Sequence, residues 1–392
     1  METKTENHRT RALDGLRGIA ILMVMFHHFA RVPQVSAAPE DVIFYRILHL
    51  GWTGVDLFFA LSGFLITGIL LRTKYQESYF KSFYGRRVLR IFPLYYFYLF
   101  CTFVILLPLI HARLSVDQQQ NVAATMAAWP WFLLYLSNIK QAMTGVFLSG
   151  NVGHLWSISI EEQFYLIWPL VVLLTSARRL FFVCVVLLVA GLIARSAMAW
   201  SSISPSIIYV FTPVRLDSLL AGSLAAICVH VGWSVRLHGK LIVLATTSIA
   251  ACLFALGSAY EGNAAIYTIG FCALAAISAC AVYYAATDEN AGTTILGSRT
   301  LVFFGKYSYA LYLFNTPVSN LMTRIAGTPR LIAGSQIPWQ IAFTLAGTAV
   351  AVLMSLASWQ LIEKHFLSAK DRLFPAGAPR RERPMTDTIE TL

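Results

Sequence analysis

The chain has 392 residues, of which 57% are hydrophobic and only 12% are charged, and its mean hydropathy is +0.64. About a quarter of the residues of a typical soluble protein are charged, so this composition excludes an ordinary soluble enzyme and favours a helical bundle in a lipid bilayer. The net charge of +11 does not indicate a nucleic-acid partner, because most basic residues lie between apolar runs or in the last thirty residues, where they set membrane orientation.

The first apolar run contains His27 and His28 and lacks a clear small-residue cleavage site. We therefore expect it to remain in the protein as the first helix and not to act as a cleavable signal. The six cysteines all fall in apolar runs, and their spacing is not that of metal ligands. This pattern predicts buried thiols and no metal site.

Ten apolar runs are long enough to cross a bilayer, which predicts an all-α polytopic bundle of about ten transmembrane helices. They cover residues 16–31, 50–71, 88–110, 155–175, 180–199, 207–230, 240–257, 265–286, 301–321 and 338–362. Residues 122–139 are also apolar, but they are short and place Pro130 between two tryptophans, which favour the membrane interface.

The distribution of basic residues decides whether residues 122–139 cross. If they do not cross, Arg178, Arg179 and the basic tail lie on the same inner side as the N-terminus, whereas a crossing segment would move all of them outside. The positive-inside rule favours the first arrangement. It predicts that both termini are cytoplasmic and that residues 111–154 form a long outer loop.

The chain divides into two parts by composition. Residues 1–363 are predicted to form one multi-pass domain, which we expect in the inner membrane of the cell. Residues 364–392 are basic, polar and rich in Pro and Arg, a composition that predicts a disordered cytoplasmic tail.

A charged group in the bilayer core costs several kcal/mol, so charged residues in apolar runs are functional candidates. Arg17 and His28 are eleven residues apart in the first run, which is almost three helical turns. Both side chains are therefore predicted on one helix face, about 16 Å apart along the axis. A snorkelling arginine with a histidine satisfied by helix contacts is the alternative, but an anchor does not explain a histidine deep in the span.

Asp56 lies just inside the outer end of the second run, in GWTGVDLFFALSGFLIT. The chain direction places it in the same half of the membrane as His28. The glycines and Ser62 of this segment allow close helix contact, so simple packing is the alternative explanation.

Arg87 and Arg90, in YGRRVLRIFPLYY, are three residues apart and share a helix face at the start of the third run. The guanidinium group offers a planar two-pronged donor that suits phosphates, such as those of CoA. From spacing alone, the ordinary basic flank of a spanning helix is the better explanation.

Glu161 and Glu162 follow one another in an otherwise apolar run, GHLWSISIEEQFYLIWP, near the outer end of the fourth predicted span. Packing does not account for two adjacent acids, so one of them is expected to face the protein interior or a water-filled cavity. Arg215 with Asp217, Asn315 and Glu363 are weaker candidates that buried ion pairs or helix contacts explain adequately.

Together these blocks resemble the acyltransferase-3 family, membrane enzymes that O-acylate sugars, lipids and some macrolides. The matching positions are Arg17 and His28; Asp56, Ser62 and Gly63; Arg87 and Arg90; Trp156, Ser157, Glu161, Gln163, Phe164 and Tyr165; and the later segments RLDSLLAG and GKYSYALYL. The matches run in order from residue 13 to about residue 317.

The chain also departs from the family pattern. Many relatives carry histidine where Asn315 stands, so we assign that position no catalytic role. Lys364 and His365 follow Glu363, where many relatives have proline. Some relatives append a hydrolase-like domain, for which this chain leaves no room, so the resemblance implies a stand-alone transferase.

The resemblance implies acyl-CoA as the donor substrate, with acetyl as the default acyl group and no permanently bound cofactor. It implies a hydroxyl-bearing acceptor, which would be a sugar, a glycan, a glycolipid or lipid-linked saccharide, or a macrolide. Arg87 and Arg90, helped by Arg17, would hold the CoA phosphates. His28 would act as general base, with Asp56 or Glu161 orienting it or balancing its charge.

Two other functions use the same residues. A solute transporter would line its path with these intramembrane charges, but transporters often show internal repeats and broken helix pairs, and neither is clear here. A non-catalytic membrane scaffold would not need His28, Asp56 and Glu161 in apolar runs.

Overall fold

The computed structural model describes residues 2–374, apart from 34–37, 112–114, 149, 202, 234–247, 249–262, 289 and 292–294. In this part of the chain every regular element is a helix, as predicted. The α-helices are α1 (Glu2–Phe29), α2 (Pro39–His49), α3 (Gly54–Thr73), α4 (Tyr79–Phe100), α5 (Leu107–His111), α6 (Val116–Ala127), α7 (Trp129–Leu133), α8 (Ser137–Thr144), α9 (Trp156–Leu174), α10 (Ala177–Ala199), α11 (Pro205–Val210), α12 (Asp217–Val231), α14 (Phe271–Thr287), α15 (Arg299–Lys306), α16 (Ser308–Ala326), α17 (Ile337–Ser358) and α18 (Lys364–Leu373).

Among the described residues, seven helical segments are long and apolar enough to cross a bilayer, so the chain is a multi-pass membrane protein. They are Arg11–Phe29, Pro39–Thr73, Tyr79–His111, Gly153–Leu174, Ala177–Ala199, Ile266–Thr287 and Ile337–Lys370. Each coincides with one of the predicted spans. The total of ten stays a prediction.

The other three predicted spans have different outcomes. Residues 207–230 contain α11, a short turn and the shorter apolar helix α12. Residues 301–321 are divided between α15 and α16, which meet at Tyr307. The sequence predicted one continuous span here because a hydropathy window does not register a bend. The span at 240–257 lies outside the described residues, except for Ser248.

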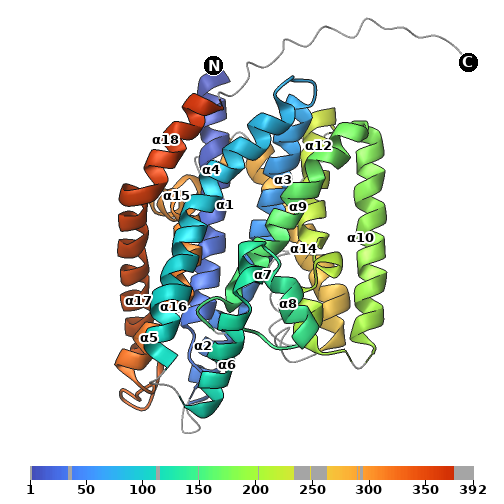
Figure 1. The fold of residues 1–392 in the computed structure, drawn as a ribbon. Coiled ribbons are helices and arrows are strands. Elements are labelled where there is room, and N and C mark those ends of the chain that lie inside the picture. Colours follow the sequence, from blue (N-terminus) through green and yellow to red (C-terminus); the bar gives the residue numbers. More distant parts are fainter. Residues whose placement is uncertain are drawn as a thin grey trace, which may run out of the picture.

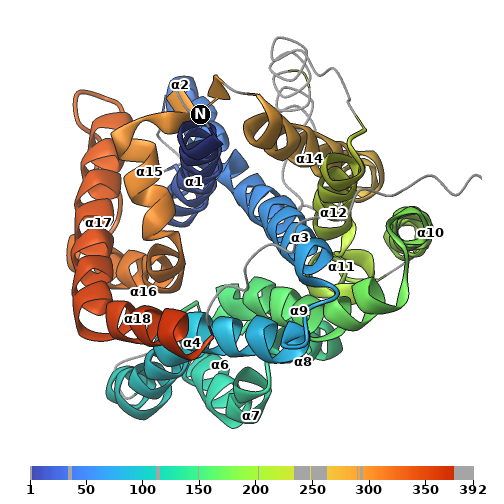
Figure 2. The same cartoon turned by 90° about the horizontal axis from the view of Figure 1, so that it is seen from above.

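The two described ends of the chain lie at the same end of the bundle. The N-terminus and α18 lie at one end of the bundle, and α2 and α6 lie toward the other (Figure 1). Along the bundle axis, α10, α12 and α14 stand on one side and α17 and α18 on the other, with α1, α3, α4, α9 and α16 between them (Figure 2). That the N-terminal end faces the cytoplasm stays a prediction.

The predicted tail begins as a helix. A π-helical turn, Trp359–Glu363, joins α17 to α18, and α18 packs against α4. The ring of Phe374, just after α18, lies so close to Gly85 of α4 that a side chain there would overlap it. Disorder from residue 364 is therefore wrong for the first ten residues of the tail, while residues 375–392 lie outside the described part.

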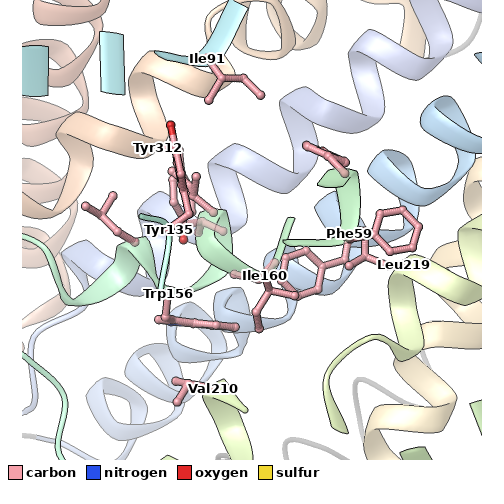
Figure 3. Packing of buried hydrophobic residues seen from close by; sticks show 14 of the residues in the cluster. Phe59, Ile91, Tyr135, Trp156, Ile160, Val210, Leu219 and Tyr312 are labelled. Atoms are coloured by element: carbon pink, nitrogen blue, oxygen red, sulfur yellow. The ribbon is translucent and has the colours of Figure 1, made fainter. Parts of the chain in front are cut away.

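Helices α3 and α12 pack with their backbones in close contact beside the site. In lipid, helices gain little from apolar burial against one another and associate through small residues and hydrogen bonds. Gly63 of α3 faces Leu219 of α12, and Gly222 of α12 faces Ala60 of α3. Phe59 of α3 lies beside Leu219 in the apolar cluster that these helices share with α9 (Figure 3).

We expect Gly63→Ala to destabilise the protein by about 1–3 kcal/mol, because the added methyl group would overlap the carbonyl oxygen of Leu219 and force the helices apart. Thermal unfolding in detergent measures the effect. Gly68→Ala, in the same helix, is the matched control, since its Cβ would meet only the flexible Arg72 side chain at 3.3 Å. Equal melting temperatures for the two variants would contradict the prediction.

Candidate active site

A cavity of about 120 Å³ opens between α1, α3, α4, α9 and α16. We call it the arginine cavity. Its polar lining includes Arg17, Ser62, Arg87, Arg90, Glu161 and Tyr165. The structure thus brings together Arg17 of α1, Arg87 and Arg90 of α4, and Glu161 of α9. All four were candidate site residues from the sequence, and their helices are far apart in the chain.

The arginine cavity brings three guanidinium groups together beside the carboxyl groups of Glu161 and Glu162. The Arg87 guanidinium lies over the Tyr165 ring, 4.7 Å from its centroid, and Arg17 Nη1 pairs with Asp14 Oδ1 at 2.5 Å. Arg90 has no carboxylate within salt-bridge distance among the described residues, and Arg17 and Arg87 repel it. Such a cluster is suited to a ligand with several phosphate groups.

A chain of hydroxyl groups holds Glu161 on the wall of the arginine cavity. Ser62 Oγ donates to Glu161 Oε1 at 2.6 Å, and the Tyr165 hydroxyl donates to Ser62 Oγ at 2.9 Å. Glu162 also lines the cavity. Gln163 points elsewhere and donates to the Tyr135 carbonyl, so it ties α9 to the segment before α8.

A second cavity, of about 220 Å³, lies toward the C-terminal end of α1. We call it the histidine cavity. His28 lines it together with His27 and with His154, which precedes α9, and the His28 and His154 ring centroids are 6.1 Å apart. The other lining side chains are mainly aromatic and include Trp52, Trp156 and Tyr209.

The hydrogen bonds around His28 indicate its tautomer. Asn315 of α16 is a hydrogen-bond partner of the ring. The Asn315 Nδ2 group already donates to the carbonyl oxygens of Leu311 and Tyr312, so its oxygen is left to accept from His28. Among the described residues, His28 Nδ1 is buried and has no partner. The Asn315 oxygen therefore favours a tautomer with the proton on the ring nitrogen that faces it.

The two cavities meet at a shared wall. Val55 of α3 and Tyr312 of α16 line both of them. The Tyr312 hydroxyl donates to the His154 carbonyl at 2.8 Å and lies 2.5 Å from Ser157 Oγ. These bonds hold the phenol ring between the arginines and the histidines.

The acyltransferase domain family matches residues 10–356, which is most of the chain. The chain belongs to the acyltransferase-3 family. The predicted O-acyltransferase identity is thereby confirmed at the level of the family.

Three relatives show how far this similarity extends. YrhL of Bacillus subtilis is 28% identical over 385 residues, which cover 93% of this chain and 56% of YrhL. The peptidoglycan O-acetyltransferase OatA of Listeria monocytogenes is 27% identical over 336 residues, or 80% of this chain and 50% of OatA. The O-acetyltransferase OatA of Staphylococcus aureus is 26% identical over 322 residues, which cover 78% of this chain and 50% of that protein. The chain spans about half the length of these relatives, and no solved structure matches it.

Asp56 lines neither cavity of this acyltransferase-3 protein. It is fully buried and accepts from Arg215 Nη1 at 3.1 Å and from Ser218 Oγ at 2.9 Å. The Arg215 guanidinium is also fully buried and lies over the Phe271 ring, 4.2 Å from its centroid. Asp56 therefore links α3 to the start of α12, and the structure does not bring it to His28.

Two residues of the site escaped the sequence reasoning. Asn315 was given no role, yet it contacts His28. His154 lies in the segment GHLWSISIEEQFYLIWP, but it precedes the helix and has no spacing to another polar residue that would indicate a functional role. The only signal of its burial was its place at the edge of an apolar run.

The described residues contain no group of three His, Cys, Asp or Glu side chains arranged to hold a metal ion.

Proposed function

We propose that this protein transfers an acyl group, acetyl by analogy with its relatives, from acyl-CoA to a hydroxyl group of a cell-envelope saccharide at the inner membrane. One observation carries the proposal: a cavity lined by arginines and a cavity lined by histidines meet at Val55 and Tyr312. The names of the OatA relatives support acetyl as the acyl group, and the Listeria name supports a glycan acceptor.

In this proposal the arginine cavity receives the donor. Arg17, Arg87 and Arg90 bind the phosphates of CoA through charge-assisted hydrogen bonds. Glu161 attracts Arg87 and Arg90 and keeps them oriented toward the cavity. The rise of about 16 Å between Arg17 and His28 along α1 is comparable with the length of a pantetheine arm, so the thioester reaches the wall at Tyr312.

The histidine cavity receives the acceptor, and His28 is the general base. The His28 ring takes the proton of the acceptor hydroxyl while the oxygen attacks the thioester carbonyl carbon. A new C–O ester bond forms and the C–S bond breaks. The CoA sulfur takes up one proton and leaves as the thiol, so the reaction releases no net proton.

The direct test uses the purified protein in detergent with radiolabelled acetyl-CoA and peptidoglycan fragments. Release of the CoA thiol should match formation of the sugar ester one for one. Uptake of the saccharide into vesicles without consumption of the thioester would reject the proposal in favour of transport.

We expect Arg87→Ala to raise the KM for acetyl-CoA by about 10- to 100-fold, because a charge-assisted hydrogen bond contributes about 1.5–3 kcal/mol. S-acetylpantetheine lacks the CoA phosphates, so its KM should not change. Arg86→Ala is the matched control, since Arg86 contacts the Phe374 carbonyl and does not line the cavity. An equal change for both donors would show that Arg87 does not bind phosphate.

A further inference from the structure

The histidine cavity contains a second histidine for which the proposed reaction has no use. Only 6% of the His154 side chain is exposed, and the ring faces the same cavity as His28. A polar ring this deeply buried needs hydrogen-bond partners. Among the described residues, neither ring nitrogen of His154 has a partner of good geometry.

A proline in α16 orients the His154 ring. Pro317 has no backbone N–H, so the carbonyl of Leu313, four residues earlier, lacks its helical partner. The backbone of Leu313 and Tyr312 interacts with the His154 ring. Carbonyl oxygens on that side favour the N–H of a neutral imidazole, which leaves the other ring nitrogen able to accept a hydrogen bond.

Two imidazole rings thus line the histidine cavity, each with a nitrogen that can accept a hydrogen bond, and their centroids are 6.1 Å apart. Two acceptors this close suit two donors on one small rigid molecule. Trp156 and Tyr209 supply flat apolar faces beside them, with ring centroids 4.9 Å apart. Neighbouring hydroxyl groups on a sugar ring match this combination.

We propose that His154 is an acceptor-binding residue, which accepts a hydrogen bond from a second hydroxyl of the saccharide whose reacting hydroxyl contacts His28. This inference rests on the proposed function and adds a specificity rule to it. A site built around a substrate hydroxyl discriminates strongly against the analogue that lacks it. The protein should therefore prefer acceptors with a neighbouring donor and discriminate against simple alcohols.

The test combines His154→Ala with acceptors that lack one hydroxyl each. The acceptors are methyl N-acetyl-β-glucosaminide and the set of its monodeoxy derivatives, with acetyl-CoA as donor. In the wild type, one derivative should lose transfer completely, and a second should lose about 10-fold or more in kcat/KM. In His154→Ala the second loss should disappear, because the protein group that recognised this hydroxyl is gone.

Further readouts separate binding from a general structural defect. His154→Ala should raise the acceptor KM by about 10-fold and leave the acetyl-CoA KM unchanged. The Tyr312 hydroxyl bonds to the main-chain carbonyl of residue 154, so the substitution keeps that contact. His154→Gln retains an acceptor oxygen and should restore part of the preference.

The outcomes distinguish this inference from the proposed function. An equal loss for the second derivative in wild type and His154→Ala would overturn the inference, and so would a wild type indifferent to all neighbouring hydroxyls. Absence of transfer from acetyl-CoA to any sugar by the wild type would instead overturn the proposed function.

Discussion

Replacing His28 with alanine should reduce acyl transfer by about 10²- to 10⁴-fold, the usual contribution of a general base. His28 lines the histidine cavity, and alanine leaves no group there to take the hydroxyl proton. Binding of acetyl-CoA should persist, because the phosphate-binding arginines lie in the other cavity. Calorimetric titration with CoA and a transfer assay measure the two properties separately.

The control for this variant is His111→Ala. His111 ends α5 and lines neither cavity, so its loss should leave turnover within about twofold of the wild type, as for most surface changes. If His28→Ala retained normal turnover, His28 would not be the base, whatever its position in the cavity.

Replacing Asp56 with alanine should destabilise the protein by about 3–5 kcal/mol, because it leaves the buried Arg215 charge without its partner. Asp217 does not fully compensate. It already pairs with Arg195 at 2.6 Å and lies 3.5 Å from Arg215, so two buried arginines would share one carboxylate. Thermal unfolding in detergent, with and without CoA, measures the loss.

A double variant separates this structural role from catalysis. Asp56→Leu combined with Arg215→Met removes both charges and keeps apolar volume, so it should recover much of the lost stability. It should also recover transfer activity, because neither residue lines a cavity. A stable double variant without activity would instead support a catalytic role for Asp56.

The sequence predicted the helical class and the family, because both are local properties. Apolar runs of sufficient length mark helices that cross lipid, and the ordered motifs lie within single segments. The same reasoning found Arg17, Arg87, Arg90 and Glu161, since charged residues in apolar runs are conspicuous. The structure brings these four into one cavity.

The sequence alone could not show which residues far apart in the chain form ion pairs. Asp56 and Arg215 are 159 positions apart, and only the packing of α3 on α12 shows that they neutralise one another. The sequence hypothesis paired Asp56 with His28 because both were expected in one half of the membrane. The depth of a residue in the membrane does not show toward which neighbouring helix its side chain points.

His154 and Asn315 were missed for a related reason. Their importance comes from Pro317, which leaves a carbonyl of α16 without its helical partner, and from the contact of α16 with α1. A proline within an apolar helix is common in membrane proteins and does not indicate which neighbour uses the released carbonyl.

The wall formed by Val55 and Tyr312 has a consequence for the cell as well as for the reaction. In the proposed reaction, substrates that approach from opposite leaflets would need an opening on each side, and two openings that joined would be a pore. Holding a phenol ring across the junction with two hydrogen bonds keeps the barrier intact between turnovers. In the proposed reaction, a closed junction would preserve the electrochemical gradient while the two cavities exchange substrates and products.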